Sequence, residues 1–243
     1  GRGAPTWPRM RNAAIGLVIA AVGATAAVYG FVAFKARDDD SAVDQALAEA
    51  RALPLVGPVL DDVPGAEARL RTALQEELRS PTTQGPPRPL VLMSELRATY
   101  IVPAMKAADA NDAMAVLSAR NTLMRHLRVT DVVICRELAV TGIQGGDRLD
   151  SVGQKLMRDM LAAIEKAYRS GRAALAGKTE RPVTADAEVR KELTEAGLTA
   201  GDFDKLQRLA RLTSDEACEL AIRLNEAPSK LPADRSGAPA RDV

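Results

Sequence analysis

The sequence AAIGLVIAAVGATAAVYGFVAF, residues 13–34, decides how the rest of the chain is interpreted. It contains no Asp, Glu, Lys, Arg or His. An α-helix rises about 1.5 Å per residue, so roughly 20 apolar residues cross a hydrocarbon core that is about 30 Å thick. We therefore expect a single transmembrane helix over residues 13–34, preceded by a short N-terminal tail over residues 1–12.

Two other interpretations of this segment remain open. Ala24-Thr25-Ala26 resembles the small-residue cleavage site of a secretory signal peptide, and Arg11 would supply its positive charge. The apolar part of a signal peptide usually spans about 7 to 15 residues, which is shorter than this run. A helix buried inside a water-soluble protein is disfavoured because the run has no polar face.

The cations on the two sides of the segment indicate its orientation. Arg2, Arg9 and Arg11 precede it, whereas Lys35 and Arg37 follow it. Because cytoplasmic flanks carry the excess of positive residues, the short N-terminus is expected in the cytoplasm. Arginine also far outnumbers lysine, which is typical of a GC-rich bacterial genome. The sequence therefore predicts a protein of the bacterial inner membrane with most of its chain in the periplasm.

Small residues recur along one side of the predicted transmembrane helix. They alternate at steps of four and three: Gly16, Ala20, Gly23, Ala27 and Gly30. Small side chains let membrane helices approach closely. We expect this helix-packing seam to support self-association or pairing with another membrane protein.

The charge of the remaining chain limits its possible partners. Beyond residue 37 it carries 28 Lys and Arg against 32 Asp and Glu, a net charge near −4. Nucleic-acid binding requires clustered positive charge, so nucleic acid is excluded as an expected partner. Aromatic residues are also scarce, which argues against surfaces that stack on bases or sugars.

Residues 35–89 are interpreted as a stalk that carries two short helices. The first is expected from Ser41 to just before Pro54, and the second over residues 66–78. Residues 55–64, with two prolines, indicate a linker between them. The sequence SPTTQGPPRP, residues 80–89, indicates a second, proline-rich linker.

Residues 90–226 are predicted to form an all-α, helical-bundle domain. An apolar stripe begins near residue 90 and is expected to kink at Pro103. The strongest helix runs over residues 151–170, where Ser151 and Gln154 have the spacing of a capping box. Residues 132–134 fit either a helix or a strand. Further helices are expected over residues 185–196, 199–211 and 214–225, where Thr199 with Asp202 and Thr213 with Glu216 have the same capping-box spacing. The tail over residues 227–243 is expected to be disordered.

The two cysteines are the most informative side chains outside the membrane segment. Cys135 and Cys218 each lie about one turn inside an expected helix. An extracytoplasmic location makes a disulfide between them plausible. Two buried free thiols are the main alternative, since free cysteine is among the most buried residue types.

Other polar residues give weak signals for a catalytic or metal site. His126 is the only histidine and lies among arginines on an expected helix, where a solvated helix face or contact with an acidic partner or anionic lipids is expected. Residues 142–147, GIQGGD, lack the phosphate-loop signature. The aspartates at helix starts are explained as caps: Asp109, Asp112, Asp147 and Asp150. We expect no catalytic residue, metal ligand or cofactor.

These observations predict a single-pass membrane protein with a helical domain that binds or scaffolds other proteins of a bacterial envelope complex. Its expected partners are the lipid bilayer and proteins, including other copies through the membrane helix. Two alternatives remain: an envelope hydrolase whose active site follows no motif, and an adaptor that faces the cytoplasm. We recognise no family resemblance in these residues.

Overall fold

The computed structural model describes residues 39–143, 148–177 and 186–242, and all regular structure within these ranges is helical. The predicted all-α fold is therefore confirmed for them. The predicted transmembrane helix and its seam of Gly16, Ala20, Gly23, Ala27 and Gly30 lie outside the described residues. No helix in the described ranges is both long and apolar enough to cross a membrane.

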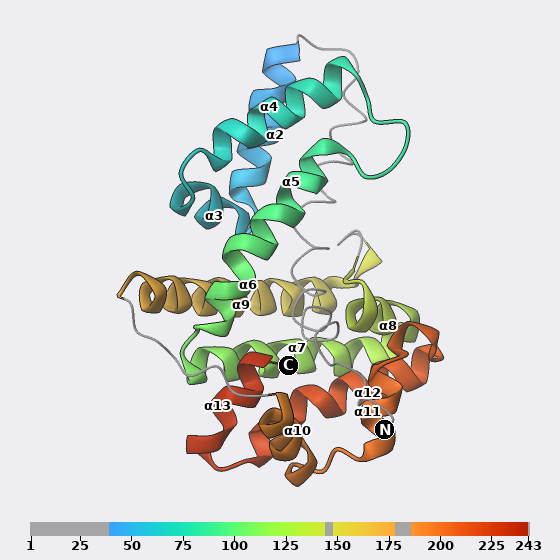
Figure 1. Cartoon of the computed structure of the whole chain (residues 1–243). Coiled ribbons are helices and arrows are strands. Elements are labelled where there is room, and N and C mark those ends of the chain that lie inside the picture. The colour runs from blue at the N-terminus through green and yellow to red at the C-terminus, as the bar shows by residue number, and fades with distance from the viewer. Residues whose placement is uncertain (1–38, 144–147, 178–185, 243) are drawn as a thin grey trace, which may run out of the picture.

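Four helices form an N-terminal layer at the top of Figure 1. They are α2 (Asp39–Ala52), α3 (Val56–Asp62), α4 (Ala66–Arg79) and α5 (Arg88–Leu96). The helix α3 occupies the stretch that the sequence analysis interpreted as a linker. It forms because Val56, Val59 and Leu60 are buried and Gly57 closes on the preceding helix. A Cβ at Gly57 would lie 2.4 Å from the carbonyl oxygen of Arg51.

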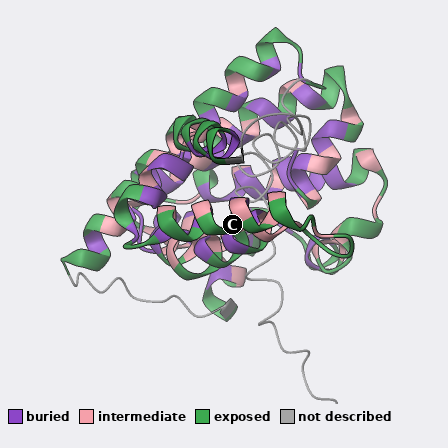
Figure 2. Cartoon of the chain, turned by 90° about the horizontal axis from the view of Figure 1, so that it is seen from above, coloured by how far each residue is buried: buried purple, intermediate pink, exposed green. Residues whose placement is uncertain are grey.

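The N-terminal layer is packed against the rest of the molecule, which differs from the stalk expected from the sequence. Val43 and Leu47 of α2 and Leu70 and Leu74 of α4 belong to the same buried apolar cluster as the helices that follow. The prolines had suggested an extended chain, but the apolar residues between them bury enough surface to hold short helices in place. Figure 2 shows buried and exposed positions alternating along the helices of the chain.

A continuous but irregular helical segment leads from α5 into the bundle. It passes through a π-helical turn, η2 (Arg97–Ile101), and then α6 (Val102–Lys106). The irregularity arises at Pro103, as expected, because proline has no N–H to donate to the preceding turn. The N–H of Val102 donates to the carbonyl of Arg97, five residues earlier.

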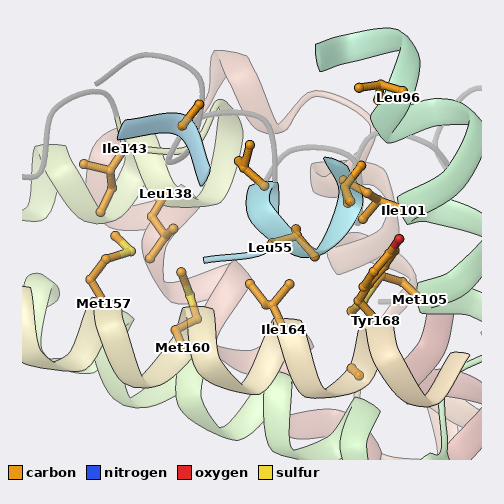
Figure 3. Packing of buried hydrophobic residues seen from close by; sticks show 14 of the residues in the cluster. Leu55, Leu96, Ile101, Met105, Leu138, Ile143, Met157, Met160, Ile164 and Tyr168 are labelled. Carbon is orange, nitrogen blue, oxygen red and sulfur yellow. The ribbon is translucent and has the colours of Figure 1, made fainter. Parts of the chain in front are cut away.

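The bundle is built around the long helix α9. Its members are α7 (Ala110–Thr130), α8 (Val132–Val140), α9 (Ser151–Ala176) and α12 (Ser214–Glu226). Figure 3 shows Met157, Met160, Ile164 and Tyr168 of α9 along one side of the core. These residues recur at intervals of three or four, which places them on one face of the helix. Residues 132–134 are helical, so the alternative of a strand there was wrong.

The remaining helices surround a second, smaller apolar cluster centred on Phe203, which is 1 % exposed. They are α10 (Asp186–Glu195), α11 (Ala200–Leu206), η4 (Leu209–Arg211), η5 (Ala227–Lys230) and α13 (Ala233–Asp242). The helix α13 lies where a disordered tail was predicted from the sequence. This helix packs on α7 through small residues: a Cβ at Gly237 would lie 2.6 Å from that of Ala110.

Capping side chains define the starts of α7, α8, α9, α11 and α12. The expected capping boxes of Thr199 with Asp202 and of Thr213 with Glu216 are both present. The helix α9 differs, because Asp150 caps it through the N–H of Gly153 and the expected box of Ser151 with Gln154 does not form. A carboxylate next to a helix start also complements the helix dipole.

Candidate binding groove

A surface groove lies between α4 and α5. It has a volume of about 530 Å³ and is open to solvent. Small and apolar residues form its floor, and charged residues form its rim. Its lining residues are Ala68, Arg69, Thr72, Ala73, Glu76, Arg88, Val91, Leu92 and Glu95. Val91 is a large apolar residue that is 52 % exposed there.

The two helices form an antiparallel hairpin, so opposite charges meet across both ends of the groove. At one end, Nη2 of Arg69 lies 2.7 Å from Oε2 of Glu95. At the other end, Nε of Arg88 lies 3.7 Å from Oε2 of Glu76. These side chains are about half exposed, and exposed ion pairs stabilise a fold by only about 0–1 kcal/mol. Their charges therefore remain accessible to a partner.

A nearly buried carboxylate, Glu77, holds the hairpin closed at its loop end. It accepts hydrogen bonds from the backbone N–H of Thr82 at 2.6 Å and from the backbone N–H of Arg88 at 3.0 Å. The side chains of both residues donate to it as well. Burial acts to raise the pKa of Glu77, but these hydrogen bonds outweigh it and the pKa is lowered. Glu77 thus fixes the proline-rich loop and the start of α5.

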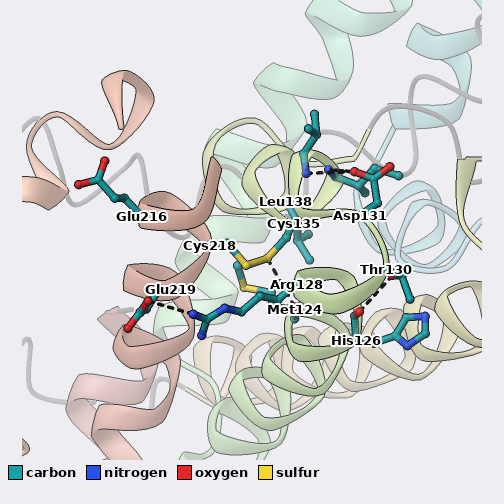
Figure 4. The surroundings of a disulfide bond; sticks show 12 residues. Met124, His126, Arg128, Thr130, Asp131, Cys135, Leu138, Glu216, Cys218 and Glu219 are labelled. Atoms are coloured by element: carbon teal, nitrogen blue, oxygen red, sulfur yellow. Dashed lines mark hydrogen bonds and ion pairs between the residues drawn. A yellow bond between two sulfur atoms is a disulfide. The ribbon is translucent and has the colours of Figure 1, made fainter. Parts of the chain in front are cut away.

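The predicted disulfide is present between α8 and α12, in the bundle. Cys135 and Cys218 are both fully buried, with their Cα atoms 5.5 Å apart. They are 83 positions apart in the sequence, and the described chain contains no free cysteine. Figure 4 shows the bond next to Met124 of α7. Its burial gives it a structural role, because a solvent nucleophile cannot reach it without unfolding.

A buried arginine lies between the same helices. Arg120 is 5 % exposed and donates to Oδ1 of Asn225 at 3.3 Å and to the carbonyl of Leu138 at 3.4 Å. Within the described chain its Nε has no hydrogen-bond partner. Burial lowers the pKa of Arg120 to about 10. The side chain lines no described pocket, so we assign it to packing between α7, α8 and α12.

The basic cluster around His126 is engaged within the chain. Arg125 pairs with Glu226, and Nη2 of Arg128 lies 3.0 Å from Oε2 of Glu219. Nε2 of His126 lies 2.9 Å from Oδ1 of Asp150. Arg125 and Arg128 are exposed, as expected for a solvated face, but ion pairs connect them to another helix. These partners were not predicted, because they lie about 25 to 100 residues away along the chain.

The described aspartates that the sequence suggested as caps lie at helix starts, where they cap a helix or form an ion pair. Asp109 caps α7 by accepting from the N–H of Asn111. The pKa of Asp112 is lowered mainly by Lys166, whose Nζ lies 2.9 Å from Oδ1. The hydrogen bond from Gly153 and then the contact with His126 lower the pKa of Asp150. Asp147 and most of the 142–147 loop lie outside the described residues.

No group of metal-ligating side chains gathers in the described ranges. Comparison with known proteins gave no match to a family model, to a curated protein or to a solved structure. The geometry alone therefore identifies the groove between α4 and α5 as the candidate site. Its residues were not predicted as a site, although their spacing on the two helices is present in the sequence.

Proposed function

We propose that this chain is a single-pass membrane protein of a bacterial envelope complex that binds other protein through the groove between α4 and α5. The observation that carries the proposal is the groove itself. It combines an exposed apolar floor at Val91 with a rim of both charge signs. Apolar surface that is exposed and surrounded by polar residues is typical of a protein interaction site.

The disulfide supports the periplasmic part of this proposal. Disulfides persist in oxidising compartments, which include the bacterial periplasm, and are rare in the cytoplasm. The bond between Cys135 and Cys218 agrees with a periplasmic location of α8 and α12. The apolar run over residues 13–34 supports the membrane anchor on the basis of its length and composition.

Whole-cell labelling tests the location. Val129 is 87 % exposed at the end of α7, so a Val129→Cys variant presents one accessible thiol while the native cysteines stay bonded. We expect this thiol to react with a membrane-impermeant maleimide in cells with a permeabilised outer membrane. The full chain should also remain in the membrane pellet after carbonate extraction. Labelling only after lysis, or release by carbonate, would contradict the proposal.

Partner binding tests the groove. The full chain, purified in mild detergent, is expected to retain a stable protein partner or oligomer. Val91→Lys adds a charge to the groove floor and should release that partner, whereas Val129→Lys, at an exposed site outside the groove, should not. Equal retention by both variants would show that the groove is not the binding site.

A further inference from the structure

The two helices of the groove carry the same pattern of residue types. Each presents an arginine, two uncharged residues and a glutamate at positions i, i+3, i+4 and i+7, which share one side of a helix. These are Arg69, Thr72, Ala73 and Glu76 on α4, and Arg88, Val91, Leu92 and Glu95 on α5.

This repeated pattern gives the groove an alternating arrangement of charge. Arg69 and Glu76 are seven residues apart on α4, which corresponds to about 10.5 Å along a helix. Arg88 and Glu95 have the same separation on α5. Because the helices are antiparallel, each arginine lies opposite a glutamate. The four charges therefore alternate in sign around the apolar floor.

We propose that the groove binds the same groove of a second copy of this chain, so that two α4–α5 hairpins form a four-helix bundle. This inference rests on the proposed function of the groove as a protein-binding site. It names the partner and the geometry, and it is separate from any contact through the membrane helix.

Charge complementarity is the main argument for a second copy. When two such faces are related by a two-fold axis parallel to the helices, α4 lies on the partner's α5 and each arginine faces a glutamate. An axis across the helices places α4 on the partner's α4, and again each arginine faces a glutamate. A partner surface of uniform charge would instead meet two corners of its own sign, which is unfavourable.

The apolar floor supports the same partner. Val91 lies midway between the two charged ends of α5, so pairing two grooves would cover this exposed side chain. Small residues on α4, such as Ala68 and Ala73, allow another helix to approach closely. Pairs of helical hairpins with residues spaced by three and four commonly pack in this way.

The small area of the groove surface determines whether two chains pair in solution or only when both are anchored in a membrane. Two short helices present a small interface, which corresponds to a weak dimer for a protein free in solution. Chains anchored in one membrane meet at a higher effective concentration, which favours weak pairing without new contacts. The test therefore uses the full chain in membranes.

Cross-linking of introduced thiols measures the contact directly. Val91→Cys and Thr72→Cys chains with different tags are expressed separately and together, and a short bis-maleimide is added. If α5 lies on α5, the thiols at position 91 of two chains link to each other. If α5 lies on α4, the thiol at position 91 links to the thiol at position 72. We expect one of these dimers at no less than ten times the yield from Val129→Cys, whose exposed site is outside the groove. Yields equal to that control would overturn the proposal.

Labelling with a monofunctional maleimide separates this inference from the proposed function. The thiol of Val91→Cys can be protected relative to that of Val129→Cys and still link to neither position 91 nor position 72 of another chain. In that case a different protein covers the groove, which overturns self-pairing and leaves the proposed function standing. If the two thiols react equally fast, the groove is open, and both proposals fail.

Exchange of one ion pair checks the geometry independently. Arg69→Glu with Glu95→Arg keeps the pair within the chain. When α4 lies on the partner's α5, the exchange also keeps opposite charges facing each other. When α4 lies on the partner's α4, it places like charges together. The exchange should therefore preserve linking between positions 91 and 72, or lower linking between two positions 91 by tenfold or more. The reverse pattern would overturn the pairing.

Discussion

The N-terminal layer and the bundle use their polar residues in different ways. In the bundle, a disulfide, the buried Arg120 and the ion pairs of α7 all connect helices of the same chain. In the hairpin of α4 and α5, one carboxylate, Glu77, is used for folding, while the groove charges stay half exposed. The bundle thus buries a disulfide and a cation between its helices, whereas the polar side chains of the hairpin, apart from Glu77, lie in exposed pairs along one face.

The largest effect is expected where the two regions join. A Cβ at Gly171 of α9 would lie 1.8 Å from the carbonyl oxygen of Ala104 in α6. Gly171→Ala should therefore separate these helices and lower the free energy of unfolding by about 3 kcal/mol or more. Chemical denaturation measures the change.

Gly201→Ala is the matched control for that substitution. Gly201 is also helical, and the nearest atom to its Cβ position is 3.7 Å away, so alanine should be neutral or stabilise by up to about 1 kcal/mol. Equal losses from both alanines would contradict a close contact between α6 and α9.

The next largest effect concerns the bundle alone. Replacing both Cys135 and Cys218 with alanine should lower the free energy of unfolding by about 2 to 4 kcal/mol, because the unfolded chain loses a crosslink. Each single replacement should cost nearly as much as the double one, since either breaks the bond. Additive losses would instead indicate two independently packed thiols.

A smaller effect should be confined to the hairpin. Glu77→Gln weakens four hydrogen bonds to Thr82 and Arg88 and should cost about 2 kcal/mol. Glu76→Gln, a neighbour that is 57 % exposed, should change stability by less than about 0.5 kcal/mol. If the two losses match, Glu77 does not hold the loop.

The pH dependence of stability gives a second test of Glu77. Its pKa is lower in the folded protein than its ordinary value of 4.5, so the folded state favours the ionised form. Its contribution should be complete above pH 4.5 and should be lost as the pH falls through the lowered pKa. The difference in stability between the native protein and Glu77→Gln should shrink over that acid range.

The smallest effect is expected at Arg120. Arg120→Met removes a buried cation that has no carboxylate partner among the described residues and keeps an unbranched chain of similar length. Such replacements are often neutral or stabilising, so we expect a change within about 1 kcal/mol in thermal or chemical unfolding. A loss of about 3 kcal/mol or more would show that the guanidinium itself is required.

Local sequence signals predicted much of the secondary structure. The helix α9 was expected from its apolar repeat, the kink from Pro103, and two capping boxes from the spacing of Thr199 and Thr213. The helices α3 and α13 were missed because their prolines and small residues resemble linkers. The helix α13 is held by contacts with the distant helix α7, and α3 is held by packing against its neighbours α2 and α4, which no local pattern reports.

The site was predictable only in part. Cysteine count and expected location suggested the disulfide, but its contact with Met124 depends on tertiary packing. The matching spacings on α4 and α5 were present in the sequence. Their role in one charged face could be recognised only from the structure, in which the hairpin places Arg69 opposite Glu95. The antiparallel direction of the two helices, which composition does not report, is what makes the charges alternate around the groove.

The most direct test of the central claim is native mass spectrometry of the full chain released from detergent micelles. Glu95→Arg places like charges together in both possible pairings, whereas Glu219→Arg reverses a similarly exposed charge in the bundle. We predict that Glu95→Arg lowers the dimer fraction at least fivefold and that Glu219→Arg leaves it unchanged. Equal dimer fractions for the two variants would contradict an outward-facing, self-complementary hairpin.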